Sequence, residues 1–228
     1  MKANRPSLIL YFLALLATII FDICNLEYLV IYAKAIVVPS IFFYYITSNN
    51  YVIGRSEGFI FLFCFIGQVF DLMNEEISEL GALFSFMIVY LMLLKMILTN
   101  YKKIKIRKTD ILPISIVVIF LVYLLISVLS LKFEKINHFR LGYSVYGVLL
   151  IFLSSIAFIS YITRGTNISL LLSIMSCCFI ASNLFYIFDQ YFPNSWIVIL
   201  IKDICQVLSY YLMTQYFLLR KKRVLHKN

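Results

Sequence analysis

Eight runs of apolar residues, each long enough to cross a lipid bilayer, dominate this 228-residue chain. A membrane-spanning α-helix needs about 20 mostly apolar residues. The sequence therefore predicts an all-α integral membrane protein, a compact bundle of eight transmembrane helices that forms a single domain over residues 1–228. The expected spans are 7–24, 28–47, 57–74, 80–99, 111–131, 141–163, 168–190 and 196–219.

The composition favours the same class of protein. Hydrophobic residues make up 63% of the chain and charged residues only 14%, whereas a soluble domain has about 25% charged residues. The net charge of +9 does not indicate binding to nucleic acid. The basic residues form short clusters beside the apolar runs, where they act as topology signals.

The positions of these clusters predict the orientation of the bundle. With eight spans, both termini lie on one side of the membrane. That side carries the clusters Lys102–Lys108 and Arg220–Arg223, together with Arg55 and Arg164. Because lysine and arginine collect on the cytoplasmic side, both termini are expected to be cytoplasmic, with a bacterial inner or plasma membrane as the location.

Acidic residues gather at the opposite ends of the spans. Four of them lie inside a predicted span, within about two turns of its end: Asp22, Asp71, Asp189 and Asp203. A charge within a lipid-spanning helix is costly, so each of these residues is a functional-site hypothesis. Lys34 and Lys202 lie at a similar depth and are candidate partners for these carboxylates.

The third run contains a polar stripe. Gly67, Gln68 and Asp71 share one face of a helix, because positions i, i+1 and i+4 lie on the same side. The last two runs add further polar residues within their spans: Asn183, Asp189, Asp203, Tyr211 and Gln215. Unsatisfied polar groups in lipid are costly, so these side chains are expected to face the bundle. They either line a cavity or hold helices together.

Other kinds of site have little support in the sequence. The five cysteines lie in apolar runs without a CxxC pair and are expected to be buried hydrophobes. His138 lies in a predicted loop and His226 in the basic tail, so neither a metal site nor a histidine triad is expected. No P-loop, GxSxG or HExxH motif is present. We expect neither a metal nor a cofactor.

Short motifs follow one another along the runs. They are AKAIVVPS with Lys34 and Pro39, GQVFDLM with Phe70 before Asp71, GALFSFMIVY from Gly81 to Tyr90, the pair Ser182-Asn183, and Tyr211 with Gln215 four residues later. The chain resembles the YhhN-like lysoplasmalogenase family in the order of these motifs, in the number of spans and in chain length. It departs from that family at three positions. The family has glycine where this chain has Phe70, and aspartate where this chain has Asn183. It often has histidine where this chain has Met87.

The resemblance implies a membrane-embedded hydrolase that cleaves the vinyl ether bond of a lysoplasmalogen. The products would be a fatty aldehyde and a glycerophospho-base. Vinyl ethers hydrolyse by protonation at carbon, which forms an oxocarbenium ion that water then traps. This chemistry needs a protonated carboxylic acid and a second carboxylate or polar group.

The roles of the site residues are a hypothesis based on the common depth of these polar groups in the outer half of the bundle. Asp71 is expected to be the acid or base, and Asp189 the second carboxylate, with Asp203 as its substitute. Asn183, Tyr211 and Gln215 are expected to orient water or substrate. The residues expected to bind substrate are Lys34, Asp203, Tyr211 and Gln215. The expected partners are a lysophospholipid substrate and membrane lipid, without nucleic acid.

Three non-enzymatic classes remain alternatives. A small transporter or ligand-binding membrane protein would also concentrate charges in a polar cavity. A structural or assembly protein would use its polar side chains only to hold helices together. The third alternative is a catalytically inactive relative of the resembling family. A pocket shared by Asp71, Asp189 and Tyr211 would favour the enzyme, whereas salt bridges filling the centre of the bundle would favour a structural role.

Overall fold

The structure, a computed structural model, describes residues 5–24, 26–73, 76–99, 106–130, 140–191 and 195–225. Every regular element in these ranges is an α-helix. In chain order the helices are α1 (Arg5–Ile23), α2 (Glu27–Ser48), α3 (Arg55–Leu72), α4 (Glu76–Thr99), α5 (Lys108–Ser130), α7 (Arg140–Arg164), α8 (Asn167–Tyr191) and α9 (Trp196–Leu225).

Seven helices in the described part of the chain are long and apolar enough to cross a membrane. The remaining helix, α3, has 18 residues and carries Arg55, Glu57 and Asp71 within that length. The fold is that of a helical, multi-pass membrane protein, as the apolar runs predicted.

Most helix ends lie within a few residues of the predicted span ends, but two differ more. Helix α9 continues to Leu225, beyond the predicted end at residue 219. Lysine and arginine are good helix formers, and cations are favoured at a helix C-terminus, so the end of the apolar run does not end the helix. Helix α4 begins at Glu76 rather than at residue 80, and acidic residues are favoured in a first helical turn.

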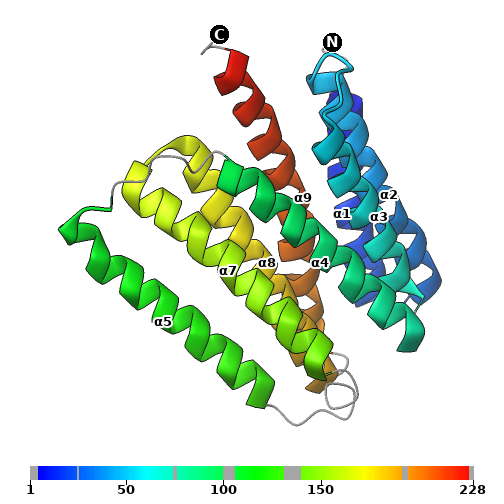
Figure 1. The fold of residues 1–228 in the computed structure, drawn as a ribbon. Helices are drawn as coiled ribbons and strands as arrows, with labels where there is room; N and C mark the ends of the chain where they lie inside the picture. Colours follow the sequence, from blue (N-terminus) through cyan, green and yellow to red (C-terminus); the bar gives the residue numbers. More distant parts are fainter. Residues whose placement is uncertain are drawn as a thin grey trace.

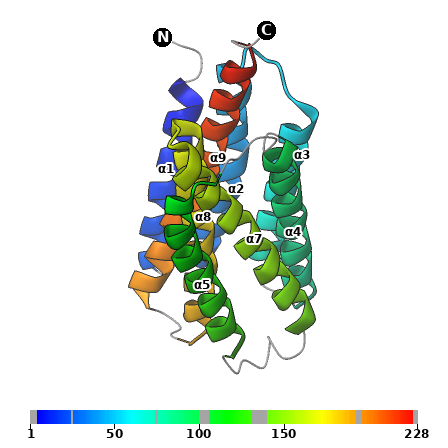
Figure 2. The ribbon, with the colours of Figure 1, turned by 60° about the vertical axis from the view of Figure 1, so that its left-hand side comes forward.

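Successive helices run in alternating directions through the bundle (Figure 1). Helix α1 begins and α9 ends at the same end of the molecule, which we call the terminal end (Figures 1 and 2). At the other end, here the distal end, α1 meets α2, α3 meets α4, and α8 meets α9. The helix segments that contain Asp22, Asp71, Asp189 and Asp203 therefore all lie in the distal half.

The packing divides the bundle into a central part and one peripheral helix. Helix α9 packs against α8, α1 and α2, while α3 packs on α4 and α2, and α7 contacts α4, α5 and α8. Helix α5 lies at the edge of the bundle and packs mainly on α7 (Figure 1). Only Leu121 of α5 is buried, so most of its apolar surface is left to face lipid.

Aromatic side chains fill the terminal half of the bundle. The rings of Phe42 and Tyr45 on α2 contact Phe61 on α3, and Tyr45 and Phe61 both contact Phe217 on α9. Nearer the middle, the Tyr11 hydroxyl of α1 donates a hydrogen bond to the Val207 carbonyl of α9. This aromatic packing forms the core of the terminal half of the bundle.

Candidate functional site

A cavity of about 160 Å³ lies in the distal half, lined by residues of α3, α4, α5, α7, α8 and α9. Leucine, isoleucine and phenylalanine side chains form a large part of its wall, including Phe86 of α4 and Leu125 of α5. Its polar lining consists of Asp71, Glu79, Tyr90, Tyr143, Tyr146, Ser182, Asn183, Tyr186, Lys202, Gln206, Ser209 and Tyr210. The cavity therefore combines an apolar wall with a group of polar side chains contributed by several helices.

Asp71 reaches this cavity from the last turn of α3. One turn earlier, Gly67 and Gln68 are buried, so the predicted polar stripe faces the bundle. A Cβ atom at Gly67 would lie 3.2 Å from the Phe86 ring and from the Ser85 Cβ, so glycine permits the close approach of α3 to α4. No hydrogen bond or ion pair joins Asp71 to another residue in the described part of the chain.

A second carboxylate, Glu79, lines the same cavity from the start of α4. The Tyr186 hydroxyl of α8 donates a hydrogen bond to Glu79 Oε1 over 3.3 Å. Tyr143 of α7 completes this part of the lining. The cavity thus presents two carboxylates and two phenols near the distal ends of four helices.

A closed ring of hydrogen bonds joins α4, α7 and α8 beside the cavity. The Tyr146 hydroxyl donates to Asn183 Oδ1 over 2.6 Å, and Asn183 Nδ2 donates to the Tyr90 hydroxyl over 3.2 Å. The two hydroxyls lie 3.0 Å apart. Because the Tyr146 hydroxyl already donates its proton to Asn183, the Tyr90 hydroxyl is the donor in the hydrogen bond between the two tyrosines. Asn183 also donates to the Phe179 carbonyl one turn earlier, which fixes its amide.

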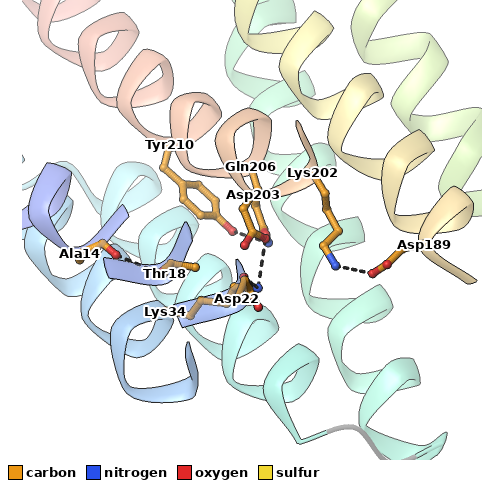
Figure 3. Close-up of polar contacts among 9 residues, drawn as sticks. All are labelled: Ala14, Thr18, Asp22, Lys34, Asp189, Lys202, Asp203, Gln206 and Tyr210. Carbon is orange, nitrogen blue, oxygen red and sulfur yellow. Dashed lines mark hydrogen bonds and ion pairs between the residues drawn. The ribbon is translucent and has the colours of Figure 1, made fainter. Parts of the chain in front are cut away.

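Lys202 and Asp189 form an ion pair at the edge of this cavity. Lys202 Nζ of α9 lies 2.6 Å from Asp189 Oδ2 of α8, and the two side chains are 15% and 20% exposed. Figure 3 shows Lys202 extending from α9 towards Asp189 on α8. Lys202 lines the cavity, whereas Asp189 does not.

A second ionic cluster joins α1, α2 and α9 on the other side of α9 (Figure 3). Lys34 Nζ lies 3.0 Å from Asp203 Oδ1 and 3.6 Å from Asp22 Oδ2. Asp203 is 1% exposed, and Asp22 and Lys34 are 19% and 15% exposed. None of these three residues lines the cavity that holds Asp71.

The remaining sequence-predicted residues also lie away from that cavity. Gln215 Nε2 donates to the Tyr44 hydroxyl of α2 over 3.1 Å. The Tyr211 ring packs against Phe12 of α1, with centroids 5.7 Å apart. The structure therefore brings Asp71 and Asn183 to one cavity and places Asp189 beside it through Lys202. The predicted site residues outside the cavity lining are Lys34, Asp189, Asp203, Tyr211 and Gln215.

Several lining residues were not among the sequence-predicted site. Glu79 lies one residue before the expected start of the fourth span at residue 80, a position typical of a solvated loop. Tyr143 and Tyr146 sit near the start of α7, a position typical of interfacial aromatic belts. The available signal was their i, i+3 spacing, which places both rings on one face. Among the described residues, no group of three or more histidine, cysteine, aspartate or glutamate side chains could hold a metal ion.

Comparison with known proteins adds no identification: no family model, no curated protein and no solved structure matches the chain. The resemblance to YhhN-like lysoplasmalogenases stays a prediction from short motifs.

Proposed function

We propose that this protein is a membrane-embedded lipid hydrolase that cleaves the vinyl ether bond of lysoplasmalogen-type lipids. The lining of the cavity supports an amphiphile as ligand. Ligand sites combine a mostly apolar wall with a few convergent polar groups. The apolar wall from α4, α5 and α7 suits a hydrocarbon chain, and the polar side chains at the distal end suit the ether and glycerol portion.

The proposal rests on one observation, that Asp71 is not paired with a lysine in the described part of the chain. The other three intramembrane aspartates each contact a lysine, Asp189 with Lys202 and both Asp22 and Asp203 with Lys34. Asp71 lines the cavity without such a partner among the described residues. Protonation of a vinyl ether at carbon needs a carboxylic acid, and a carboxyl group keeps its proton more readily where no cation is paired with it.

The positions of the neighbouring groups support further roles in this proposal. Glu79, the second carboxylate of the cavity, would stabilise the oxocarbenium ion or position the attacking water, and the Tyr186 hydroxyl would hold it in place. Lys202, oriented by Asp189, would offer its charge to the phosphate of the substrate. In this assignment Asp189 acts through Lys202, and Asn183 acts through the hydrogen-bonded ring with Tyr90 and Tyr146.

Helix α5 provides the route by which a lipid would enter. Leu121, Leu125 and Leu129 of α5 line the cavity, and the helix packs mainly on α7. An element with few packing partners opens at a lower free-energy cost than a central one. A single-chain lipid would therefore enter sideways from the bilayer, through a gap that opens when α5 moves away from the bundle.

We further propose that all eight helices span a bacterial inner or plasma membrane with both termini in the cytoplasm. Arg55, Arg164 and Arg220 lie near the ends of helices that meet the terminal end. The positive-inside rule makes this end cytoplasmic. The cavity then lies beneath the extracytoplasmic surface.

The decisive experiment measures fatty aldehyde released from a lysoplasmalogen by the purified full-length protein. Asp71→Asn should abolish aldehyde release while leaving the thermal unfolding of the protein unchanged. The matched control is Asp110→Asn, which removes a carboxylate in the first turn of α5, where Asp110 accepts a hydrogen bond from the Arg107 backbone. Turnover by Asp71→Asn at the wild-type rate would remove Asp71 from the reaction.

A non-enzymatic ligand-binding protein is the second candidate. The cavity favours it, because an apolar wall with a few convergent polar groups can bind a ligand whether or not a reaction follows. This candidate predicts saturable binding of a lysolipid without aldehyde release from any vinyl ether lipid.

A further inference from the structure

The Asp22–Lys34–Asp203 cluster combines two carboxyl groups with one ammonium group in the interior of the bundle. With both carboxyl groups ionised, the cluster carries one net negative charge. Lys202, the neighbour of Asp203 on α9, is paired with Asp189. Buried charges in membranes are costly unless they are paired. The cluster therefore has capacity for one further positive charge.

A second hollow, of about 260 Å³, lies directly against this cluster between α1 and α9. Asp22 and Asp203 line it. Asp203 is 1% exposed, and its Oδ2 atom has no hydrogen-bond partner among the described residues. An acceptor that is buried and unpaired at the wall of a hollow requires a donor, since leaving it unsatisfied is unfavourable. The position of Asp203 Oδ2 at the wall and the negative charge of the carboxylates both favour a cation in this hollow.

The rest of the lining selects the kind of cation. Aliphatic side chains and Trp196 complete the wall of this hollow. Calcium and magnesium need about six or more oxygen ligands, which two carboxylate residues in an apolar wall do not supply. An ammonium group with carbon substituents suits this wall better, because its charge meets the carboxylates while its carbon atoms contact aliphatic and indole surfaces. Indole rings are also the strongest aromatic partners of such cations.

We propose that the hollow between α1 and α9 binds an organic ammonium group, with Asp203 and Asp22 as its anionic partners and Trp196 as its aromatic wall. The site is separate from the cavity that holds Asp71, and its ligand would connect the distal ends of α1 and α9. The proposal is independent of the hydrolase function. The ammonium group could belong to a free amine or to a lipid head group at the membrane surface.

Trp196 makes the proposal directly measurable, because it is the single tryptophan of the chain. The full-length protein in a maltoside detergent, which carries no ammonium group, is titrated with tetramethylammonium chloride or ethanolamine hydrochloride. We expect a saturable change in tryptophan fluorescence and a rise in the thermal unfolding midpoint. Sodium chloride at equal ionic strength should produce neither effect. Equal responses to sodium, or no saturable change in either measurement, would overturn the proposal.

Two variants locate the site, and a third is the control. Asp203→Asn should weaken ammonium binding about tenfold or more, because it removes a charge-assisted contact. Leu200→Phe leaves every carboxylate and Lys34 in place but narrows the hollow, so it should weaken binding even if Asp203→Asn fails to fold. Glu57→Gln removes a carboxylate paired with Arg220 at the terminal end and should bind like the wild type. Wild-type affinity in Leu200→Phe would refute the location.

Nanodiscs distinguish the two sources of the ammonium group. In discs of phosphatidylglycerol alone, added ethanolamine should produce the fluorescence change. If a lipid head group is the ligand, discs containing phosphatidylethanolamine should already show the bound signal and respond no further. If the ligand is a free amine, both kinds of disc should respond equally.

Discussion

Replacement of Lys34 by methionine tests the ionic core of the bundle most directly. Methionine keeps the length and apolar stem of lysine but removes the ammonium group that contacts Asp203 and Asp22. The variant therefore leaves two carboxylates close together in the interior without their shared cation. The cost of losing the cation is larger for Asp203 than for Asp22, because Asp203 is 1% exposed whereas Asp22 is 19% exposed.

The distances allow an estimate of the effect. At 3.0 and 3.6 Å, each contact provides an attraction of about 5 kcal/mol at an effective dielectric constant of about 20. Desolvation of the three ions offsets much of this attraction in the intact cluster. Removing one partner of a buried pair nevertheless costs about 3–5 kcal/mol, because the remaining charge stays buried. We expect Lys34→Met to lose stability of this size.

The assay is reversible unfolding of the purified protein by sodium dodecyl sulfate in mixed micelles, followed by the loss of helical circular dichroism. Lys95→Met is the matched control, since Lys95 also lies within a helix span but is exposed. It should change the unfolding free energy by no more than about 0.5 kcal/mol. Lys34→Met/Asp203→Asn should recover roughly 2 kcal/mol of the loss, because the unpaired charge is removed as well. If Lys34→Met matches Lys95→Met, or the double variant is no more stable than Lys34→Met alone, the buried cluster does not contribute as argued.

Two other expected outcomes test the hydrogen-bonded ring and the orientation. Tyr146→Phe leaves Asn183 Oδ1 without its donor and should destabilise the protein by about 0.6–1.7 kcal/mol in the same unfolding assay. Tyr123→Phe, which alters an exposed tyrosine of α5, should have no effect, and equal values for both variants would contradict the ring. Green fluorescent protein fused to the C-terminus should fluoresce in a bacterial host, whereas alkaline phosphatase fused there should be inactive; active phosphatase would reverse the orientation.

The helices and the general depth of the polar groups were predictable because both depend on local sequence. A run of about 20 apolar residues becomes a helix in lipid regardless of its neighbours, since every backbone group must be satisfied within the segment. The same reasoning placed the four intramembrane aspartates at a similar depth and suggested that Lys34 and Lys202 pair with some of them. Both lysines do form ion pairs with aspartates.

The division of the polar residues into separate sites was not predictable. Asp203 and Lys202 are adjacent in the sequence, but their side chains leave α9 in different directions, one towards α1 and α2 and the other towards α8. The predicted meeting of Asp71 with Tyr211 and Gln215 depended on their common depth in the outer half of the bundle. In the structure, Tyr211 and Gln215 pack on α1 and α2 instead of lining the cavity.

The sequence by itself determined the helices, their approximate ends and the segregation of charge between the two ends of the bundle. Only the tertiary structure decided that Asp71 shares a cavity with Glu79 and Tyr146, and that Lys34 lies between two carboxylates. The physical reason is that spans in lipid are apolar on their outer faces as well as on much of their inner faces. Their sequence pattern therefore gives little information on how each helix is rotated, and the rotation of each helix decides which polar side chains meet.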